Sequence, residues 1–409
     1  MSVEHPPVTA GDGYRPFLDG LRAVAVYLVV LFHAGLGGFV GGFVGVDVFF
    51  VLSGFLVTQV LLRDLVAGGG VGFRRFYARR VRRLLPAAFV VLVVSGLVYA
   101  ALASPVEVLD ARGAFRAAFL YVANWHFVAQ SADYFGADVA SSPVLHFWSL
   151  AVEEQFYVVW PLLLAALVAV GGRFGDRRWV VVRWVVVAGV VGSLVWAWSL
   201  RGSDPNRAYY GTDARAYQLL VGAVLALSPG WLGWVGRFVR GVRWVGLVGL
   251  VGLVVVGSSW VRVDAIERGM LAAVVTVVVI GALEASSGGV GRWVLSRPAV
   301  VYLGKISYGT YLWHWPVIVV MARSFELSAV STAAMAVLVA TGLASLSFQV
   351  LEHPVRVSGW LDRHRFGVIA AGLTVSVVSG LVLIPVIVDR PATSGALTAS
   401  GPHVGTGGF

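Results

Sequence analysis

Apolar stretches of about twenty residues recur along this chain, and they constrain its fold more than any other feature. Only 13% of the 409 residues are charged, compared with about 25% in an average soluble domain. The sequence therefore predicts an all-α, polytopic membrane bundle of about 10–11 transmembrane helices. The candidate spans are roughly 19–37, 43–66, 84–103, 147–171, 179–199, 214–228, 243–260, 267–285, 302–323, 329–351 and 367–388.

Basic residues lie in short clusters between the spans, and their pattern predicts a cytoplasmic N-terminus because cytoplasmic loops are enriched in Lys and Arg. The most basic loop is 73–86, FRRFYARRVRRLLP. It falls in the cytoplasm together with four later basic segments only if the short, more polar segment 111–128 does not cross. We therefore expect 111–128 to be an external, interfacial or re-entrant helix. The net charge of +10 then reflects membrane orientation, and no nucleic-acid partner is expected.

The expected organisation has four parts. These are a cytoplasmic tail (1–18), a transmembrane domain (19–356), an additional C-terminal helix (367–388) and a flexible extracytoplasmic tail (389–409). The chain has no cysteine, which excludes disulfides and a cysteine nucleophile. It also lacks a His-Glu-x-x-His zinc signature, an acidic calcium loop and a nucleotide-binding loop, so no metal cofactor is expected.

The first span carries an arginine and a histidine. Arg22 and His33 are ten residues apart, which places them on one helical face about 16 Å from each other. Asp19 lies one turn before Arg22 and is its nearest potential charge partner. Ionisable groups inside a bilayer are costly and favour a functional role. The alternative is that Arg22 reaches the interface and His33 hydrogen-bonds a neighbouring helix.

The segment 146–157, HFWSLAVEEQFY, places four polar side chains on one helical face: His146, Ser149, Glu153 and Tyr157. Core packing explains such an alignment poorly, so the pattern favours a site. Glu153 could orient a catalytic histidine or bind substrate hydroxyls.

Arginines 79, 80, 82 and 83 allow two interpretations that are compatible with each other. They can anchor the topology, and they can bind phosphate groups of a ligand such as coenzyme A.

Three later segments carry further polar residues. Asp213 and Arg215 could form a surface ion pair or contribute to a site. In 303–318, Ser307, Tyr311 and His314 share a face, and His314 could be functional or structural. In LEHPVR (351–356), Glu352, His353 and Arg356 are expected to cap a helix end.

Several motifs, in order along the chain, resemble those of the membrane-bound acyltransferase-3 family. They are LDGLRAVAVYLVVLFH, GVDVFFVLSGFLVT, FYARRVRRLLPA, HFWSLAVEEQFYVVWP, SYGTYLWHWPV and LEHPVR, which together span residues 14 to about 356. The resemblance implies transfer of an acyl group, acetyl first, from cytoplasmic acyl-coenzyme A to a hydroxyl of a cell-surface glycan or lipid-linked sugar. It also implies a location in a bacterial plasma membrane. Relatives with an additional final helix often carry an external SGNH hydrolase-like domain. The expectation here is either that a separate SGNH-type or glycan-assembly protein is a partner, or that none is needed.

The resemblance also implies roles for individual residues. His33 would be catalytic, as acyl carrier or general base, with Arg22 in the same motif and Glu153 in support. Arg80, Arg82 and Arg83 would hold the coenzyme A phosphates. The supporting or substrate-binding set comprises Asp19, Asp47, Ser53, His146, Ser149, Asp213, Arg215, Tyr308 and His314.

A second hypothesis is a proton-coupled transporter or flippase for a polar solute, in which the same buried groups form the pathway. Dependence on coenzyme A separates it from the acyltransferase. A purely structural membrane subunit leaves the buried histidine and glutamate unexplained.

Overall fold

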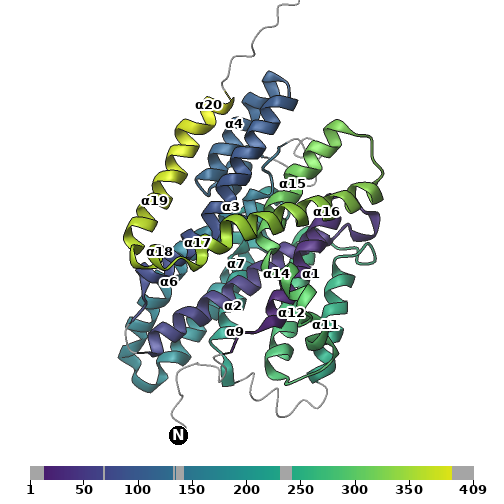
Figure 1. The fold of residues 1–409 in the computed structure, drawn as a ribbon. Coiled ribbons are helices and arrows are strands. Elements are labelled where there is room, and N and C mark those ends of the chain that lie inside the picture. Colours follow the sequence, from purple (N-terminus) through teal and green to yellow (C-terminus); the bar gives the residue numbers. More distant parts are fainter. Residues whose placement is uncertain (1–12, 68–69, 132–133, 135–141, 231–241, 389–409) are drawn as a thin grey trace, which may run out of the picture.

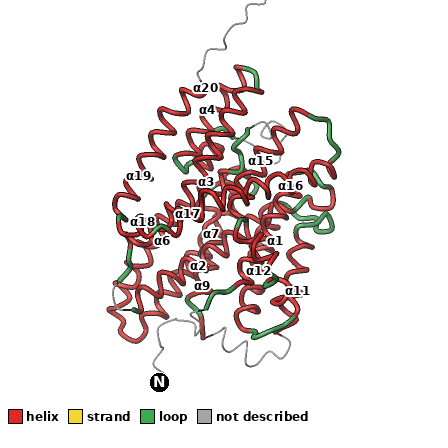
Figure 2. The backbone as a smooth tube through the Cα atoms, in the orientation of Figure 1, coloured by secondary structure: helices red, strands yellow, loops and turns green. Residues whose placement is uncertain are grey.

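The described chain is almost entirely helical (Figures 1 and 2). The computed structural model describes residues 13–67, 70–131, 134, 142–230 and 242–388, and it contains no strand within these ranges. The helices of the first half are α1 (Pro16–His33), α2 (Gly45–Val66), α3 (Phe73–Leu102), α4 (Pro105–Phe119), α5 (Ala123–Ala129), α6 (Phe147–Gly171), α7 (Arg178–Leu200), α8 (Pro205–Tyr210) and α9 (Thr212–Ala226). Those of the second half are α11 (Val242–Val256), α12 (Ala265–Ala285), α13 (Val290–Leu295), α14 (Pro298–Lys305), α15 (Ser307–Ser324), α16 (Ala329–Ser347), α17 (His353–Val357), α18 (Gly359–Arg363), α19 (Arg365–Val378) and α20 (Ile384–Val388). Short 3-10 helices η1 (Gly37–Phe39), η2 (Gly42–Val44) and η4 (Gly172–Arg177), and π-helical turns η5 (Phe348–Glu352) and η6 (Ser379–Leu383), connect or extend them.

Seven helical segments of the described chain are long and apolar enough to cross a membrane. One of them, Phe147–Leu200, contains both α6 and α7. The spans expected at 214–228, 243–260 and 302–323 correspond to shorter or less apolar helices, namely α9, α11 and α15. The all-α membrane bundle predicted from the sequence is therefore confirmed. The side of the membrane on which the N-terminus lies stays a prediction.

The basic segment 73–86 is helical, so the loop expected there is wrong. It forms the first half of α3, which continues without interruption to Leu102. Arginine, leucine and alanine are good helix formers, and the long arginine stems carry the charges away from the apolar surface. The arginines are therefore held at fixed helical spacing.

The segment 111–128 is not one helix. α4 ends at Phe119 and α5 begins at Ala123, and between them Tyr121 has a φ of 53°. A residue other than glycine in this left-handed region interrupts a helix. α4 has 15 residues, or about 22 Å of helix, which is less than the about 30 Å of a bilayer core.

Helix α2 packs closely against α9 and also contacts α1. Glycines allow the contact between α2 and α9. A Cβ atom on Gly54 would lie 1.8 Å from the carbonyl oxygen of Leu219, and one on Gly222 would lie 2.1 Å from that of Val51. Small residues at such crossings let two backbones touch. This contact fixes the side of α2 that faces the site described below.

The final helices α19 and α20 pack along α3 and α4 (Figure 1). The hydroxyl of Ser376 donates a hydrogen bond to the carbonyl of Phe119, which ties α19 to the end of α4. Gly372 faces Val81 of α3 at the same interface. The expected C-terminal helix thus exists as α19, η6 and α20, and it supports the helix that carries the arginines.

Candidate active site

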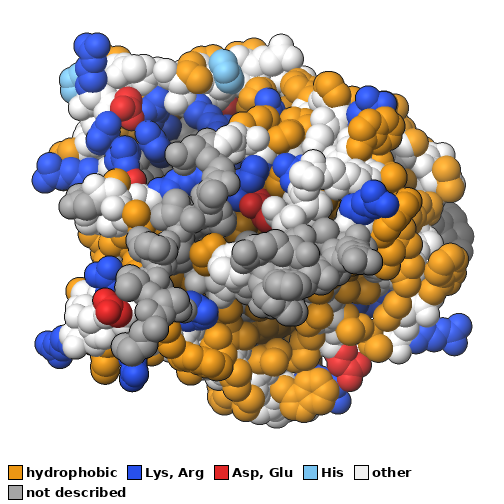
Figure 3. Space-filling model, turned by 90° about the horizontal axis from the view of Figure 1, so that it is seen from below, with side chains coloured by type: hydrophobic (Ala, Val, Ile, Leu, Met, Phe, Trp, Pro, Cys, Tyr) orange, Lys and Arg blue, Asp and Glu red, His pale blue; other side chains and the backbone are white. Residues whose placement is uncertain are grey.

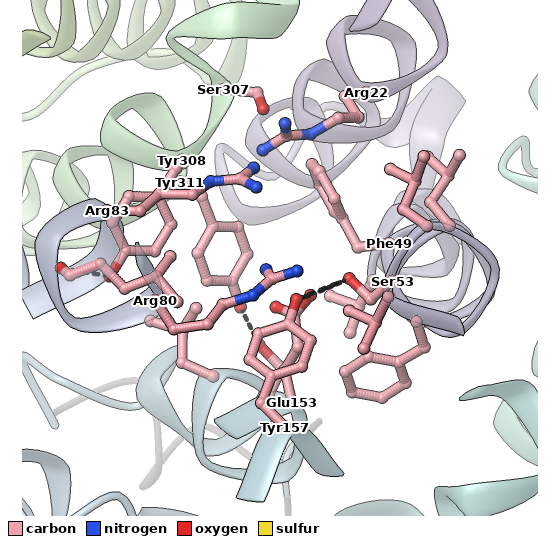
Figure 4. Close-up of a pocket in the computed structure, with 18 residues that line it drawn as sticks. Arg22, Phe49, Ser53, Arg80, Arg83, Glu153, Tyr157, Ser307, Tyr308 and Tyr311 are labelled. Carbon is pink, nitrogen blue, oxygen red and sulfur yellow. Dashed lines mark hydrogen bonds between the residues drawn. The ribbon is translucent and has the colours of Figure 1, made fainter. Parts of the chain in front are cut away.

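A central cavity lies between α1, α2, α3, α6 and α15 (Figure 4). Its polar lining residues are Arg22, Ser53, Arg80, Arg83, Ser149, Glu153, Tyr157, Ser307, Tyr308 and Tyr311. The cavity has a volume of about 60 Å³.

Glu153 forms the polar centre of this cavity. The hydroxyl of Ser53 donates a hydrogen bond to Glu153 Oε1, and the hydroxyl of Tyr157 donates to the same oxygen. Tyr157 Oη also lies 2.9 Å from Ser53 Oγ. The carboxylate thus joins a hydroxyl of α2 to a hydroxyl one turn along α6. Of the two roles expected for Glu153, binding a hydroxyl matches these contacts, whereas orienting a histidine does not.

Three guanidinium groups point into the same cavity from two helices (Figure 4). Arg22 comes from α1, and Arg80 and Arg83 come from α3. The guanidinium of Arg80 also lies 4.3 Å from the ring centroid of Tyr157, a cation–π contact. Because three cations surround one carboxylate, the cavity carries net positive charge. This charge can bind an anion or stabilise a carbonyl oxygen that becomes negative.

Asp19 interacts with Arg22 only weakly. The closest approach, from Arg22 Nη1 to Asp19 Oδ1, is 3.8 Å, whereas Asp19 Oδ2 accepts a hydrogen bond of 2.6 Å from Tyr14. Arg22 therefore keeps donor capacity on the cavity side.

A second hollow, which we name the basic basin, adjoins the central cavity. It is lined by Val60, Asp64, Arg75, Phe76, Arg79, Arg80, Arg82, Arg83, Arg356, Val357, Ser358, Gly359 and Asp362. Arg80 and Arg83 line both spaces, so they form the boundary between basin and cavity. Seen from below, basic side chains gather on part of this face of the molecule (Figure 3).

Arg82 differs from its neighbours because its side chain is already occupied. It is 5% exposed and donates to the carbonyl oxygens of Val355, Arg356 and Ser358 at 2.7–3.0 Å. These contacts hold the segment after α16 against α3. Arg82 thus has a structural function, while Arg80 and Arg83 are the arginines of this run that face the cavity.

A histidine cluster, formed by His33, His146 and His314, lies farther along α1, α6 and α15. His33 Nδ1 is 2.9 Å from His314 Nε2, and His33 Nε2 is 2.7 Å from the hydroxyl of Tyr134. The ring of His146 lies 5.5 Å from that of His314. The three histidines that the sequence analysis places in separate motifs therefore meet.

The hydrogen bonds fix the proton positions when the rings are neutral. His314 Nδ1 contacts the carbonyl oxygen of Tyr311, which can only accept, so this nitrogen carries the proton. His314 Nε2 is then an acceptor, and His33 Nδ1 must donate to it. Consequently His33 Nε2 is unprotonated and accepts from the hydroxyl of Tyr134. His33 presents a basic nitrogen to a hydroxyl group.

Tyr311 and Ser149 separate the histidine cluster from the central cavity. Both line the cavity and their hydroxyls are 2.6 Å apart, while the Tyr311 hydroxyl donates to the carbonyl of His146 at 2.9 Å. Glu153 and His146 are seven residues apart on the same face, or about 10 Å along the helix. The described residues therefore form two polar centres, one around Glu153 and one around His33.

The remaining predicted acidic and basic residues have other partners than expected. Asp213 and Arg215 do not form an ion pair with each other. Asp213 Oδ2 pairs with Arg207 at 2.9 Å in a partly exposed position. Arg215 pairs with Asp47 at 2.7 Å, and these two side chains are fully buried. The reason is that neighbours two residues apart on a helix point to different sides. Gln218 also donates to Asp47, which anchors α9 to α2.

The model of a family described as an acyltransferase domain matches residues 15–350, most of the chain. The chain belongs to this acyltransferase family. The resemblance to the acyltransferase-3 family noted from the sequence motifs is thereby confirmed.

Named relatives of this acyltransferase come from several bacteria. The peptidoglycan O-acetyltransferase OatA of Listeria monocytogenes is 34% identical over 362 residues, covering 85% of this chain and 57% of that protein. A Bacillus subtilis protein named "Putative peptidoglycan O-acetyltransferase YrhL" is 34% identical over 357 residues, with coverages of 85% and 56%. A Staphylococcus aureus protein named "Putative O-acetyltransferase SAS0844" is 31% identical over 361 residues, with coverages of 85% and 58%. The acyltransferase spans less than three-fifths of the length of these relatives. No solved structure matches it.

The fold of this acyltransferase brings together most residues singled out in the sequence. Arg22, Ser53, Ser149, Glu153 and Tyr308 line the central cavity with Arg80 and Arg83. His33, His146 and His314 form the other centre, while Asp47 and Arg215 are buried between helices and Asp213 lies at the surface end of α9. Sequence reasoning missed Tyr134 and Gln218, because neither belongs to a motif with a recognisable spacing.

Proposed function

We propose that this acyltransferase moves a short acyl group, acetyl first, from acyl-coenzyme A to a hydroxyl of a cell-surface glycan or a lipid-linked sugar. The observation that carries the proposal is the central cavity, where a carboxylate with a bound hydroxyl faces three guanidinium groups. An acyl transfer needs a base for a hydroxyl proton and positive charge for the oxygen of the carbonyl. Both are present within one small space.

The basic basin is the proposed entry for the donor. Coenzyme A carries several phosphates, which arginines bind through paired hydrogen bonds. Because Arg80 and Arg83 border both the basin and the cavity, a donor held by its phosphates in the basin can extend its thioester between them. Arg82 is excluded from this role by its three carbonyl contacts.

We further propose that the basin faces the cytoplasm of a bacterium, where acyl-coenzyme A is made, and that the histidine cluster faces the acceptor side of the plasma membrane. The excess of arginine around the basin supports this orientation. His33 Nε2 accepts a hydrogen bond from the hydroxyl of Tyr134, and an acceptor hydroxyl can take the same position. A separate SGNH-type or glycan-assembly protein would then carry the product further.

The test uses purified full-length protein in lipid nanodiscs with radiolabelled acetyl-coenzyme A and peptidoglycan fragments. The wild type is expected to release coenzyme A and to label the glycan, and His33→Ala is expected to fold but to lose labelling. If the wild type neither binds nor consumes the donor, the proposed function is wrong. In that case transport of a polar solute explains the buried charges better.

A further inference from the structure

Three serine hydroxyls line the central cavity, and their surroundings differ. Ser149 shares its hydroxyl with Tyr311, and Ser307 Oγ has no hydrogen-bond partner among the described residues. Only Ser53 donates to a carboxylate, that of Glu153. A carboxylate that accepts a serine proton is the arrangement that activates a serine as a nucleophile.

The position of the cavity bears on the order of events. The donor reaches it past Arg80 and Arg83, which border the basin, and the histidine cluster lies on the other side of Tyr311. An acyl group that passes from the donor side to the acceptor side can be carried by a nucleophile that lines the cavity between them.

We propose that Ser53 is this nucleophile and that the enzyme passes through an acyl-serine intermediate. The inference rests on the proposed use of acyl-coenzyme A. Ser53 Oγ attacks the carbonyl carbon of the thioester, so an oxygen–carbon bond forms and the carbon–sulfur bond breaks. The hydroxyl proton moves to Glu153 and from there to the sulfur of the departing coenzyme A. In the second half of the reaction the oxygen of the acceptor hydroxyl attacks the same carbonyl carbon, its proton passes through Glu153 to Ser53 Oγ, and the bond between that oxygen and the carbon breaks. The guanidinium groups that face the cavity stabilise the negative oxygen that forms on the carbonyl carbon.

The hydroxyl of Tyr157 orients Ser53 for this attack. Its hydroxyl lies 2.9 Å from Ser53 Oγ and donates to Glu153 Oε1. The two donors to one carboxylate oxygen keep the serine hydroxyl turned toward the base. The residue is itself held by the guanidinium of Arg80 over its ring.

Isotope exchange tests the intermediate without any acceptor. Labelled coenzyme A enters unlabelled acetyl-coenzyme A only if the acyl group first leaves the donor and then returns, which requires an acyl-enzyme. The experiment uses the full-length protein in nanodiscs, with acetyl-coenzyme A and labelled coenzyme A. We expect exchange by the wild type and background exchange by Ser53→Ala.

Two further variants keep the test specific. Ser95→Ala is the matched control, because Ser95 is buried, lies outside the cavity and has no hydrogen-bond partner in the part of the chain that the structure describes. It is expected to exchange at the wild-type rate. Ser53→Cys retains a nucleophile, and its acyl product is expected to be cleaved by neutral hydroxylamine, unlike the serine ester. Size-exclusion profiles and thermal midpoints of all variants verify folding.

The outcomes separate this inference from the proposed function. Glycan labelling by the wild type without any isotope exchange means direct transfer and overturns the acyl-enzyme. Exchange that persists in Ser53→Ala overturns the assignment to Ser53. A wild-type protein that neither exchanges nor consumes acetyl-coenzyme A contradicts the proposed function itself. Exchange lost in Ser53→Ala and kept in Ser95→Ala supports the inference.

Discussion

The central cavity and the histidine cluster are both polar, but they are built in different ways. In the cavity, charged groups from three helices surround an open space. In the cluster, neutral rings hydrogen-bond to one another and to Tyr134, with aromatic rings packed around them; Trp315, for example, lies 4.8 Å from the ring of His33. Charge suits a ligand that carries phosphates and a thioester, whereas neutral bases suit an uncharged hydroxyl. The difference indicates one centre for the donor and one for the acceptor.

The largest expected effect separates the two centres directly. Glu153→Gln removes the base from the cavity and should reduce both isotope exchange and glycan labelling by about 10²–10⁴-fold, the usual contribution of a general base. His33→Ala should reduce glycan labelling by a similar factor while isotope exchange continues. Both reactions are measured on the same preparations. If a folded His33→Ala protein also loses isotope exchange, His33 takes part in the donor reaction and the two centres are not separate.

The buried pair of Asp47 and Arg215 is expected to matter for stability. Asp47→Asn leaves the Arg215 charge without its counter-ion, and breaking a buried pair costs about 3–5 kcal/mol. We expect a clear fall in the thermal midpoint in detergent. The double variant Asp47→Leu, Arg215→Met should recover part of the loss, since no buried charge remains. If the single and double variants are equally unstable, the contact between Asp47 and Arg215 does not account for the loss of stability.

Arg82 and Arg83 of α3 test the donor side of the comparison, because only Arg83 lines the cavity. Arg83→Gln should raise the KM for acetyl-coenzyme A about ten- to a hundredfold, because charged hydrogen bonds contribute about 1.5–3 kcal/mol, and should also lower kcat, because this guanidinium faces the cavity. Arg82→Gln should instead lower the thermal midpoint, because three carbonyls lose their donor.

The exposed Arg363 lies outside the basin, so Arg363→Gln is the matched control for both. Steady-state kinetics and thermal unfolding on each variant distinguish the roles. A raised KM in Arg82→Gln at unchanged stability would contradict the structural assignment.

The smallest expected effect lies outside both centres, at the exposed pair of Glu107 and Arg323. Arg323 and Ser104 hydrogen-bond the Glu107 carboxylate and lower its pKa to about 2. The folded pKa lies below the unfolded value of about 4.3, so the contribution is present above pH 4.3 and disappears as pH falls toward 2. Glu107→Gln should therefore lower the thermal midpoint slightly at pH 7, and less so at high salt. An equal difference at pH 3 and pH 7 would contradict this origin.

The sequence predicts the helices well because apolar length and helical period are local properties. The face formed by Ser149, Glu153 and Tyr157 follows directly from the 3.6-residue period, and all three line one cavity. Local patterns say less about partners. Ser53 and Glu153 are 100 residues apart and Asp47 and Arg215 are 168 apart, so only the packed bundle shows that they touch.

Spacing also fails to distinguish adjacent arginines. Arg80, Arg82 and Arg83 look equivalent in the sequence, but their directions on α3 differ by about 100° per residue. Arg82 therefore faces the chain after α16, while Arg80 and Arg83 face the cavity. The carbonyl oxygens that hold Arg82 belong to residues more than 270 positions away. No pattern within the arginine run indicates this.

The most direct test of the two-centre account is a structure of the protein in nanodiscs with a non-cleavable thioether analogue of acetyl-coenzyme A. The account predicts phosphates in the basic basin and the carbonyl carbon within about 3.5 Å of Ser53 Oγ, the distance of a reactive approach. Density for the acyl group at His33, or for the nucleotide outside the basin, would contradict it.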